Sequence, residues 1–135
     1  MNKQDLRVIT IGLGYIGLPT SVLIADQGIY VTGIDINMEI VDSLNKGQIH
    51  IVEPELQSEF SNVLKNGFFR ASTQTEEGNV YLIVVPTPFK GNHEPDISFV
   101  ENATNSIIEK LKPGDLFIIE STCPVGTTEK IADLI

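Results

Sequence analysis

Residues 6–17, LRVITIGLGYIG, decide the fold of this chain. Their first half is a short apolar run that ends at a glycine, which is typical of a buried β-strand. Their second half has the pattern G-x-G-x-x-G and leads into a segment with the apolar spacing of a helix. In this setting Gly12 allows a tight turn, Gly14 lets the backbone approach a pyrophosphate, and Gly17 permits close packing of the helix on the strand. The pattern favours a dinucleotide site, with a merely structural glycine turn as the alternative.

The rest of the chain alternates strands and helices. Further strands are expected at residues 30–34, 68–71, 80–85 and 116–119, the last two of them buried. Helices are expected over residues 16–27 and 127–135, and from the capping or opening residues Asn37, Pro54 and Asp96. In the first helix Val22 and Leu23 are expected to face inward. The alternation predicts one α/β domain over residues 1–135, a Rossmann-like, doubly wound, mostly parallel sheet with helices on both faces.

The composition of the chain limits the classes of partner and the cellular compartment that are expected for it. The chain has 135 residues and a formal net charge of −9, which argues against nucleic-acid and anionic-membrane partners because both require clustered basic residues. Its single cysteine, Cys123, excludes an intrachain disulfide and fits a reducing, cytoplasmic setting. There is no signal-peptide pattern and no apolar run near the roughly 20 residues that span a bilayer. The sequence stops inside an expected helix at Leu134 and Ile135, so we expect a truncated domain.

Asp35 is the expected ribose ligand. It follows the second expected strand, about 20 residues after the glycine motif, where dinucleotide-binding folds place an acid. A carboxylate there can accept hydrogen bonds from both adenosine ribose hydroxyls and would repel the additional phosphate of NADP. The position therefore favours NAD, and a solvated aspartate that caps the next helix is the alternative.

Two later loops follow strands at the same expected edge of the sheet. Residues 85–89, VPTPF, form a stiff loop in which the Thr87 hydroxyl can reach a cofactor, or else only a rigid turn. Residues 120–128, ESTCPVGTT, crowd hydroxyl and N–H groups at a strand-to-helix junction, which suits an anion or a nicotinamide carboxamide. A helix N-cap at Thr127 is the alternative for this second loop.

Taken together, these segments resemble the UDP-glucose/GDP-mannose dehydrogenase family. The order GLGYIGLP, GIDIN, VPTPF and ESTCPVGTT is similar to the amino-terminal signature of that family and covers essentially all 135 residues. The stretch VPTPFKGNHEPDISFVE is similar to the members that act on UDP-N-acetyl-D-mannosamine, and next to those that act on UDP-N-acetylglucosamine. UDP-glucose is a further alternative, because the substrate is selected mainly elsewhere in the family's chain.

The resemblance implies a reaction and a cofactor. Members oxidise the sugar C6 alcohol to a carboxylate with two NAD, through a thiohemiacetal and a thioester on a catalytic cysteine. The implied cofactor-binding residues are Gly12, Leu13, Gly14, Tyr15, Ile16, Gly17, Asp35, Pro86, Thr87, Thr122 and Thr128. Thr122 is also the implied catalytic position, since in the family this threonine helps to hold the reacting water. The resemblance further implies a nucleotide-sugar substrate and a homodimer of the full-length protein.

This sequence also differs from the family's pattern at several points. The family's catalytic cysteine, lysine and asparagine lie in segments that this sequence does not contain, so the fragment alone is expected to be inactive. Cys123 occupies a variable position of the S-T-x-P motif and is interpreted as a small structural hydrophobe. His50 and His93 lack partners at ligand spacing, and no metal site is expected. A nucleotide-sensing Rossmann module without chemistry and a β-hydroxyacid dehydrogenase are alternatives, which the VPTPF and ESTCPVGTT segments disfavour.

Overall fold

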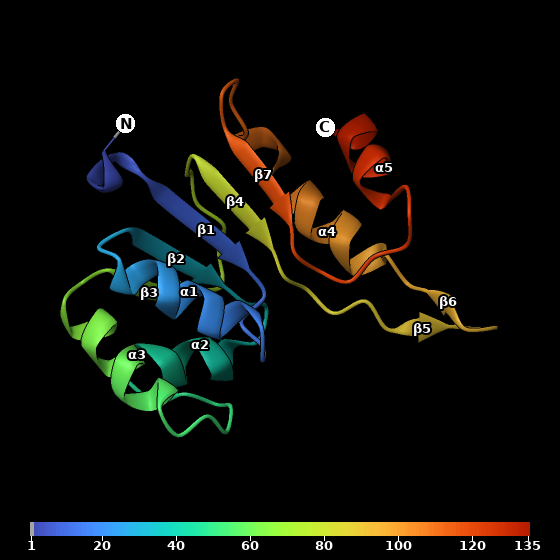
Figure 1. The fold of residues 1–135 in the computed structure, drawn as a ribbon. Helices are drawn as coiled ribbons and strands as arrows, with labels where there is room; N and C mark the ends of the chain where they lie inside the picture. The colour runs from blue at the N-terminus through green and yellow to red at the C-terminus, as the bar shows by residue number, and fades with distance from the viewer. Residues whose placement is uncertain (1) are drawn as a thin grey trace.

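A computed structural model describes residues 2–135 of the chain (Figure 1). Its centre is a five-stranded parallel sheet in the order β3-β2-β1-β4-β7. The strands are β1 (Arg7–Ile11), β2 (Tyr30–Ile34), β3 (Phe69–Ser72), β4 (Val80–Ile83) and β7 (Leu116–Ile119). Because all five strands run in one direction, the loops that leave their carboxyl ends meet at one edge of the sheet.

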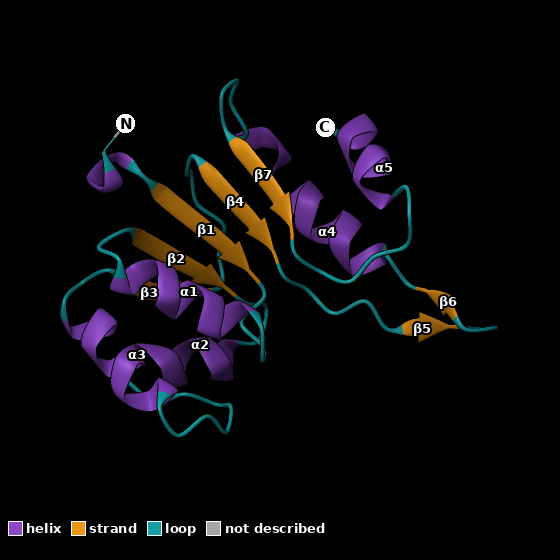
Figure 2. Cartoon of the chain, in the orientation of Figure 1, coloured by secondary structure: helices purple, strands orange, loops and turns teal. Residues whose placement is uncertain are grey.

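Helices cover both faces of the sheet (Figure 2). On one face lie α1 (Gly17–Asp26), α2 (Met38–Asn45) and α3 (Leu56–Lys65), and on the other lie α4 (Ser98–Ile107) and α5 (Thr127–Leu134). The first core contains Leu18, Leu44 and Phe60, and the second contains Tyr81 and Ile107, all of them fully buried. This arrangement confirms the predicted doubly wound α/β fold.

The ends of the helices follow local signals in the sequence. The Asn37 side chain accepts a hydrogen bond from the Glu39 N–H at 3.0 Å and caps α2, as predicted. Asp96 accepts one from the Ser98 N–H at 2.9 Å at the start of α4. The N-cap at Thr127, the alternative interpretation of this loop, is not found, because Gly126 holds the cap position with φ of 92°. The Thr127 hydroxyl is buried and donates to the Pro124 carbonyl at 2.8 Å.

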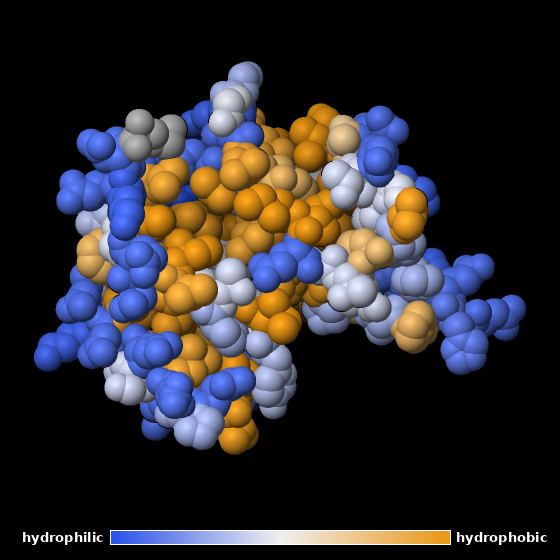
Figure 3. Space-filling model, viewed as in Figure 1, coloured by the Kyte–Doolittle hydropathy of each residue, from blue (hydrophilic) through white to orange (hydrophobic). Residues whose placement is uncertain are grey.

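Two predicted burials are corrected by the structure. Leu23 is 67% exposed, because Leu18, Val22 and Ala25 turn toward the sheet and leave Leu23 on the flank of α1. In β7, Leu116 and Ile118 are 54% and 38% exposed. These two side chains lie on the α1 side of the sheet, where β7 is the outermost strand. Figure 3 shows apolar side chains gathered across the middle of this side of the molecule.

A short hairpin was not expected from the sequence. It consists of β5 (Phe89–Lys90) and β6 (Glu94–Pro95), which pair antiparallel and project away from the main sheet (Figure 1). Two single 3₁₀ turns, η1 (Lys3–Asp5) and η2 (Ile108–Lys110), complete the described elements. None of the helices within residues 2–135 has both the length and the apolarity needed to cross a membrane.

Candidate functional site

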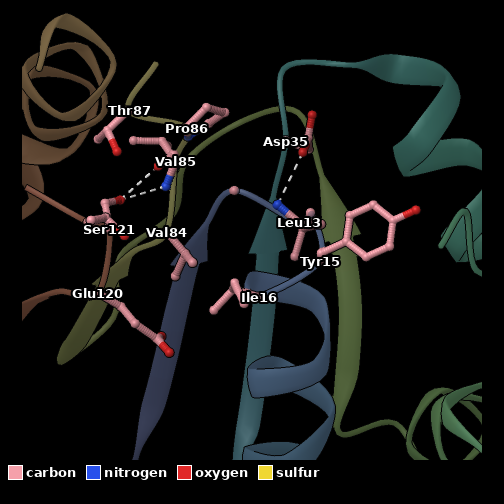
Figure 4. A pocket seen from close by; sticks show the side chains of 13 residues that line it. Leu13, Tyr15, Ile16, Asp35, Val84, Val85, Pro86, Thr87, Glu120 and Ser121 are labelled. Atoms are coloured by element: carbon pink, nitrogen blue, oxygen red, sulfur yellow. Dashed lines mark hydrogen bonds between the residues drawn. The ribbon is translucent and has the colours of Figure 1, made fainter. Parts of the chain in front are cut away.

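A cleft of about 400 Å³ lies at the carboxyl edge of the sheet (Figure 4). Four segments that are far apart in the sequence line it, and each follows a strand. The lining residues are Gly12, Leu13, Gly14, Tyr15, Ile16, Asp35, Val84, Val85, Pro86, Thr87, Glu120, Ser121 and Thr122. The sheet order brings these segments together, since β1 lies between β2 and β4 and β7 lies beside β4.

The glycine loop is shaped by three different requirements. Gly12 has φ of 104°, and a Cβ built there would lie 2.2 Å from the Val84 carbonyl oxygen. A Cβ on Gly17 would lie 1.9 Å from the Gly12 carbonyl oxygen, so this position also excludes a side chain. A Cβ on Gly14 would meet nothing within 4 Å, although Gly14 lines the cleft. The loop therefore needs glycine at positions 12 and 17 for its own packing. At Gly14 the space that a side chain would occupy is part of the open cleft.

Asp35 connects the end of β2 to the glycine loop. One carboxylate oxygen accepts a hydrogen bond from the Leu13 N–H at 3.1 Å, and the other accepts from the Asn37 N–H at 2.9 Å. The side chain is half-buried and remains on the wall of the cleft. Sequence reasoning placed Asp35 correctly at the end of the strand but did not foresee its contact with the loop. The contact holds a carboxylate beside the glycine loop, on the wall of the cleft.

The loops after β4 and β7 are joined by Ser121. Its hydroxyl accepts a hydrogen bond from the Val85 N–H at 2.9 Å and donates to the Val85 carbonyl at 2.9 Å. Pro86 and Thr87 follow this contact in one loop (Figure 4). Thr122 follows it in the other loop. Ser121, Val84 and Glu120 line the cleft but were missed as site residues, because only the pairing of β4 with β7 reveals that they converge.

Two predicted site residues lie outside the lining of the cleft. Gly17 is buried at the start of α1 beneath the loop, so its role is structural. Thr128 is exposed in the first turn of α5 and does not line the cleft. The structure thus brings together the first five residues of the glycine motif, Asp35, Pro86, Thr87 and Thr122, but it leaves Thr128 apart.

Cys123 has the surroundings of a structural residue. Its thiol packs against the apolar core beneath α4 and α5, and this burial raises its pKa, while a hydrogen bond with Thr127 has the smaller, opposite effect. A protonated thiol is a poor nucleophile at neutral pH. His50 and His93 are both exposed, and in the part of the chain that is described no three His, Cys, Asp or Glu side chains gather as metal ligands would.

Comparisons with known proteins agree with this geometry. The UDP-N-acetyl-D-mannosamine dehydrogenase of Escherichia coli K12 is 54% identical over 126 residues, which cover 93% of this chain and 30% of that protein. The structure of the UDP-N-acetyl-mannosamine dehydrogenase from Staphylococcus aureus matches with a TM-score of 0.92 and 42% identity, over 95% of this chain and 31% of that one. A ternary complex of GDP-mannose dehydrogenase from Pseudomonas aeruginosa matches with a TM-score of 0.87 and 26% identity. The match covers 93% of this chain and 30% of that one.

Only part of each relative is matched. The chain spans about 30% of the length of these relatives. Residues 6–135 match the family described as UDP-glucose/GDP-mannose dehydrogenase, NAD binding domain. The chain therefore belongs to the UDP-glucose/GDP-mannose dehydrogenase family and forms its NAD-binding domain.

Proposed function

We propose that NAD lies across the cleft with its pyrophosphate over residues 12–16. The observation that carries this proposal is the open space at Gly14, where a Cβ would meet no protein atom within 4 Å although both neighbouring motif glycines are tightly packed. Backbone N–H groups at the amino end of α1 suit a pyrophosphate, because the helix terminus favours negative charge. A bulkier residue at Gly14 would fill the space that the pyrophosphate needs.

In this orientation the adenosine ribose lies on Asp35. The two oxygens of this carboxylate each accept one backbone hydrogen bond, which leaves lone pairs for the ribose hydroxyls. The same charge opposes a phosphate on the 2′ oxygen, so NAD is preferred to NADP. The nicotinamide half then extends toward Pro86, Thr87 and Thr122 at the other end of the cleft.

We further infer that the whole protein oxidises the C6 alcohol of a UDP-sugar, with UDP-N-acetyl-D-mannosamine as the substrate. Support comes from the 54% identity to the Escherichia coli enzyme of that name and from the match to the family's cofactor domain. When bound, NAD supplies a hydride acceptor, and the residues of this chain hold and orient it. Thr122 is exposed and lines the cleft, which supports the proposal that its hydroxyl contacts the nicotinamide end or holds a water there. This chain alone is proposed to bind NAD without turnover, because its one cysteine, Cys123, is not among the described residues that line the cleft.

Calorimetric titration of the chain with NAD and with NADP tests the cofactor proposal. We expect NAD to bind at least about tenfold more tightly than NADP. The reason is that a carboxylate within contact distance of the additional phosphate of NADP lowers the affinity at least this much. In Asp35→Ala the ratio of the two dissociation constants should approach one. A wild-type chain that is folded by circular dichroism yet binds neither nucleotide, or binds both equally, would contradict the proposal.

A further inference from the structure

Glu120 has a position in the cleft that the proposed role of NAD does not yet use. It directly follows β7 and lines the cleft together with the glycine loop and Asp35. Figure 4 shows Glu120 and Asp35 on opposite sides of the cleft, with the glycine loop between them. In the proposed orientation of NAD, Asp35 holds the adenosine end, so Glu120 lies on the side of the cleft toward which the nicotinamide half extends.

The carboxylate of Glu120 is directed toward α1 by one weak contact. Its Oε1 accepts a hydrogen bond from the Thr20 hydroxyl at 3.4 Å, while its backbone N–H donates to the Ile83 carbonyl at 2.9 Å. The backbone bond fixes where the side chain begins, and the long contact with Thr20 only inclines the carboxylate toward α1. Unlike Asp35, Glu120 receives no backbone N–H on its carboxylate among residues 2–135.

The charge of Glu120 is therefore largely uncompensated within the cleft. The lining residues include two carboxylates, Asp35 and Glu120, but no lysine, arginine or histidine among the described positions. A group that carries positive charge in one state and none in another interacts with such a carboxylate differently in the two states. The nicotinamide ring is such a group, since it is cationic in oxidised NAD and neutral in NADH.

We propose that Glu120 makes the cleft selective for oxidised NAD over NADH by placing a negative charge at the nicotinamide end. The inference rests on the proposed binding of NAD in this cleft. At separations of about 6–8 Å across partly solvated protein, a single charge changes the affinity ratio about three- to tenfold. In a reaction that uses two NAD for each sugar, this selectivity favours release of NADH and entry of fresh NAD between the two hydride transfers.

The test compares Glu120→Gln with the wild-type chain in titrations with oxidised NAD, NADH and ADP-ribose. Glutamine keeps an oxygen that accepts from Thr20 and removes only the charge, so folding and the Thr20 contact are retained. In Glu120→Gln we expect the affinity for oxidised NAD to fall about three- to tenfold relative to the affinity for NADH. The affinity for ADP-ribose should stay unchanged, because ADP-ribose has no nicotinamide. The difference should shrink at high salt, because the carboxylate is exposed and screened.

Two further variants separate charge from structure. Glu59→Gln, on the exposed side of α3 and outside the cleft, changes net charge by the same amount and should leave the ratio of dissociation constants at the wild-type value. Thr20→Val removes the hydrogen bond but not the charge, and should preserve most of the selectivity. An unchanged ratio in Glu120→Gln, with oxidised NAD still bound, overturns this inference alone. Absence of NAD binding by the folded wild-type chain overturns it together with the proposed function.

Discussion

The Asp35 carboxylate accepts a hydrogen bond from the Leu13 N–H at 3.1 Å, across 22 residues of sequence. The acid at the end of β2 thereby holds the glycine loop at the end of β1, while its other oxygen accepts from the Asn37 N–H before α2. A side chain proposed to bind ribose is thus also part of the fold. Its replacement affects both the binding site and the stability of the loop that forms the site.

Asp35→Ala should lower stability even without nucleotide. Loss of two charge-assisted hydrogen bonds that are only half-buried should reduce the free energy of unfolding by about 1–3 kcal/mol. Urea denaturation monitored by circular dichroism measures this change. Asp42→Ala, which removes an exposed aspartate from α2, is the matched control and should change stability by less than about 0.5 kcal/mol. Equal stability of wild type and Asp35→Ala would show that the hydrogen bonds from Leu13 and Asn37 make no net contribution to the free energy of unfolding.

Gly14→Ala and Gly17→Ala should separate binding from folding. An alanine Cβ at Gly17 would overlap the Gly12 carbonyl oxygen at 1.9 Å, so unfolding should become easier by about 3 kcal/mol or more. At Gly14 the methyl group meets no protein atom, so this variant should keep the wild-type melting temperature. Its affinity for NAD should nevertheless fall at least about tenfold, because the methyl group fills the space in which the pyrophosphate would contact the backbone. A Gly14→Ala variant with wild-type affinity would mean that the pyrophosphate does not lie over this residue.

Ser121→Ala should loosen the two loops beyond β4 and β7. Both hydrogen bonds between the Ser121 hydroxyl and Val85 measure 2.9 Å, and their loss should cost about 1–2 kcal/mol of stability. Thr122→Val changes the neighbouring exposed residue and should leave the melting temperature unchanged. Differential scanning calorimetry of the two variants side by side measures the contrast. If Thr122→Val were the more destabilised, Ser121 would not be the residue that joins the loops.

Asp96→Asn should make the chain less sensitive to acid. Hydrogen bonds from the Ser98 hydroxyl and N–H hold the pKa of Asp96 below its usual range. A carboxylate with a lowered pKa in the folded state stabilises it above the unfolded-state pKa, and this contribution disappears as the pH falls through the folded-state pKa. An asparagine side-chain oxygen can accept the same hydrogen bond from the Ser98 N–H without titrating. The slope of unfolding free energy against pH between about pH 5 and 2 should therefore be smaller in the variant, and an identical slope would exclude this contribution.

Cys123 should react slowly with thiol reagents while the chain is folded. Burial raises the pKa of its thiol, so little thiolate is present at neutral pH. Ellman's reagent should label the folded chain more slowly than the urea-unfolded chain, and the rate should rise with pH. Cys123→Ala should retain NAD affinity, since the residue does not line the cleft. Rapid labelling of the folded chain at neutral pH would contradict the structural interpretation.

Local features of the sequence determined much of this protein. The glycine motif, the strand before it and the Asn37 cap were all predicted, because each depends on neighbouring residues whose backbone preferences are strong. Alternation of apolar segments likewise predicted the parallel sheet with helices on both faces. The observed ends of most helices and strands agree with the predicted ends within a residue or two, for the same reason.

Tertiary structure alone decided which side chains meet and which remain exposed. Leu23 and Leu116 have the hydrophobicity of core residues, yet they are exposed because α1 turns one away and the sheet order places the other on an outer strand. Thr20 and Glu120 are 100 residues apart and meet only because β7 lies beside β4. Hydrophobic patterns specify that a residue prefers burial, but the neighbours available to bury it, or to share its charge, are set by strand order.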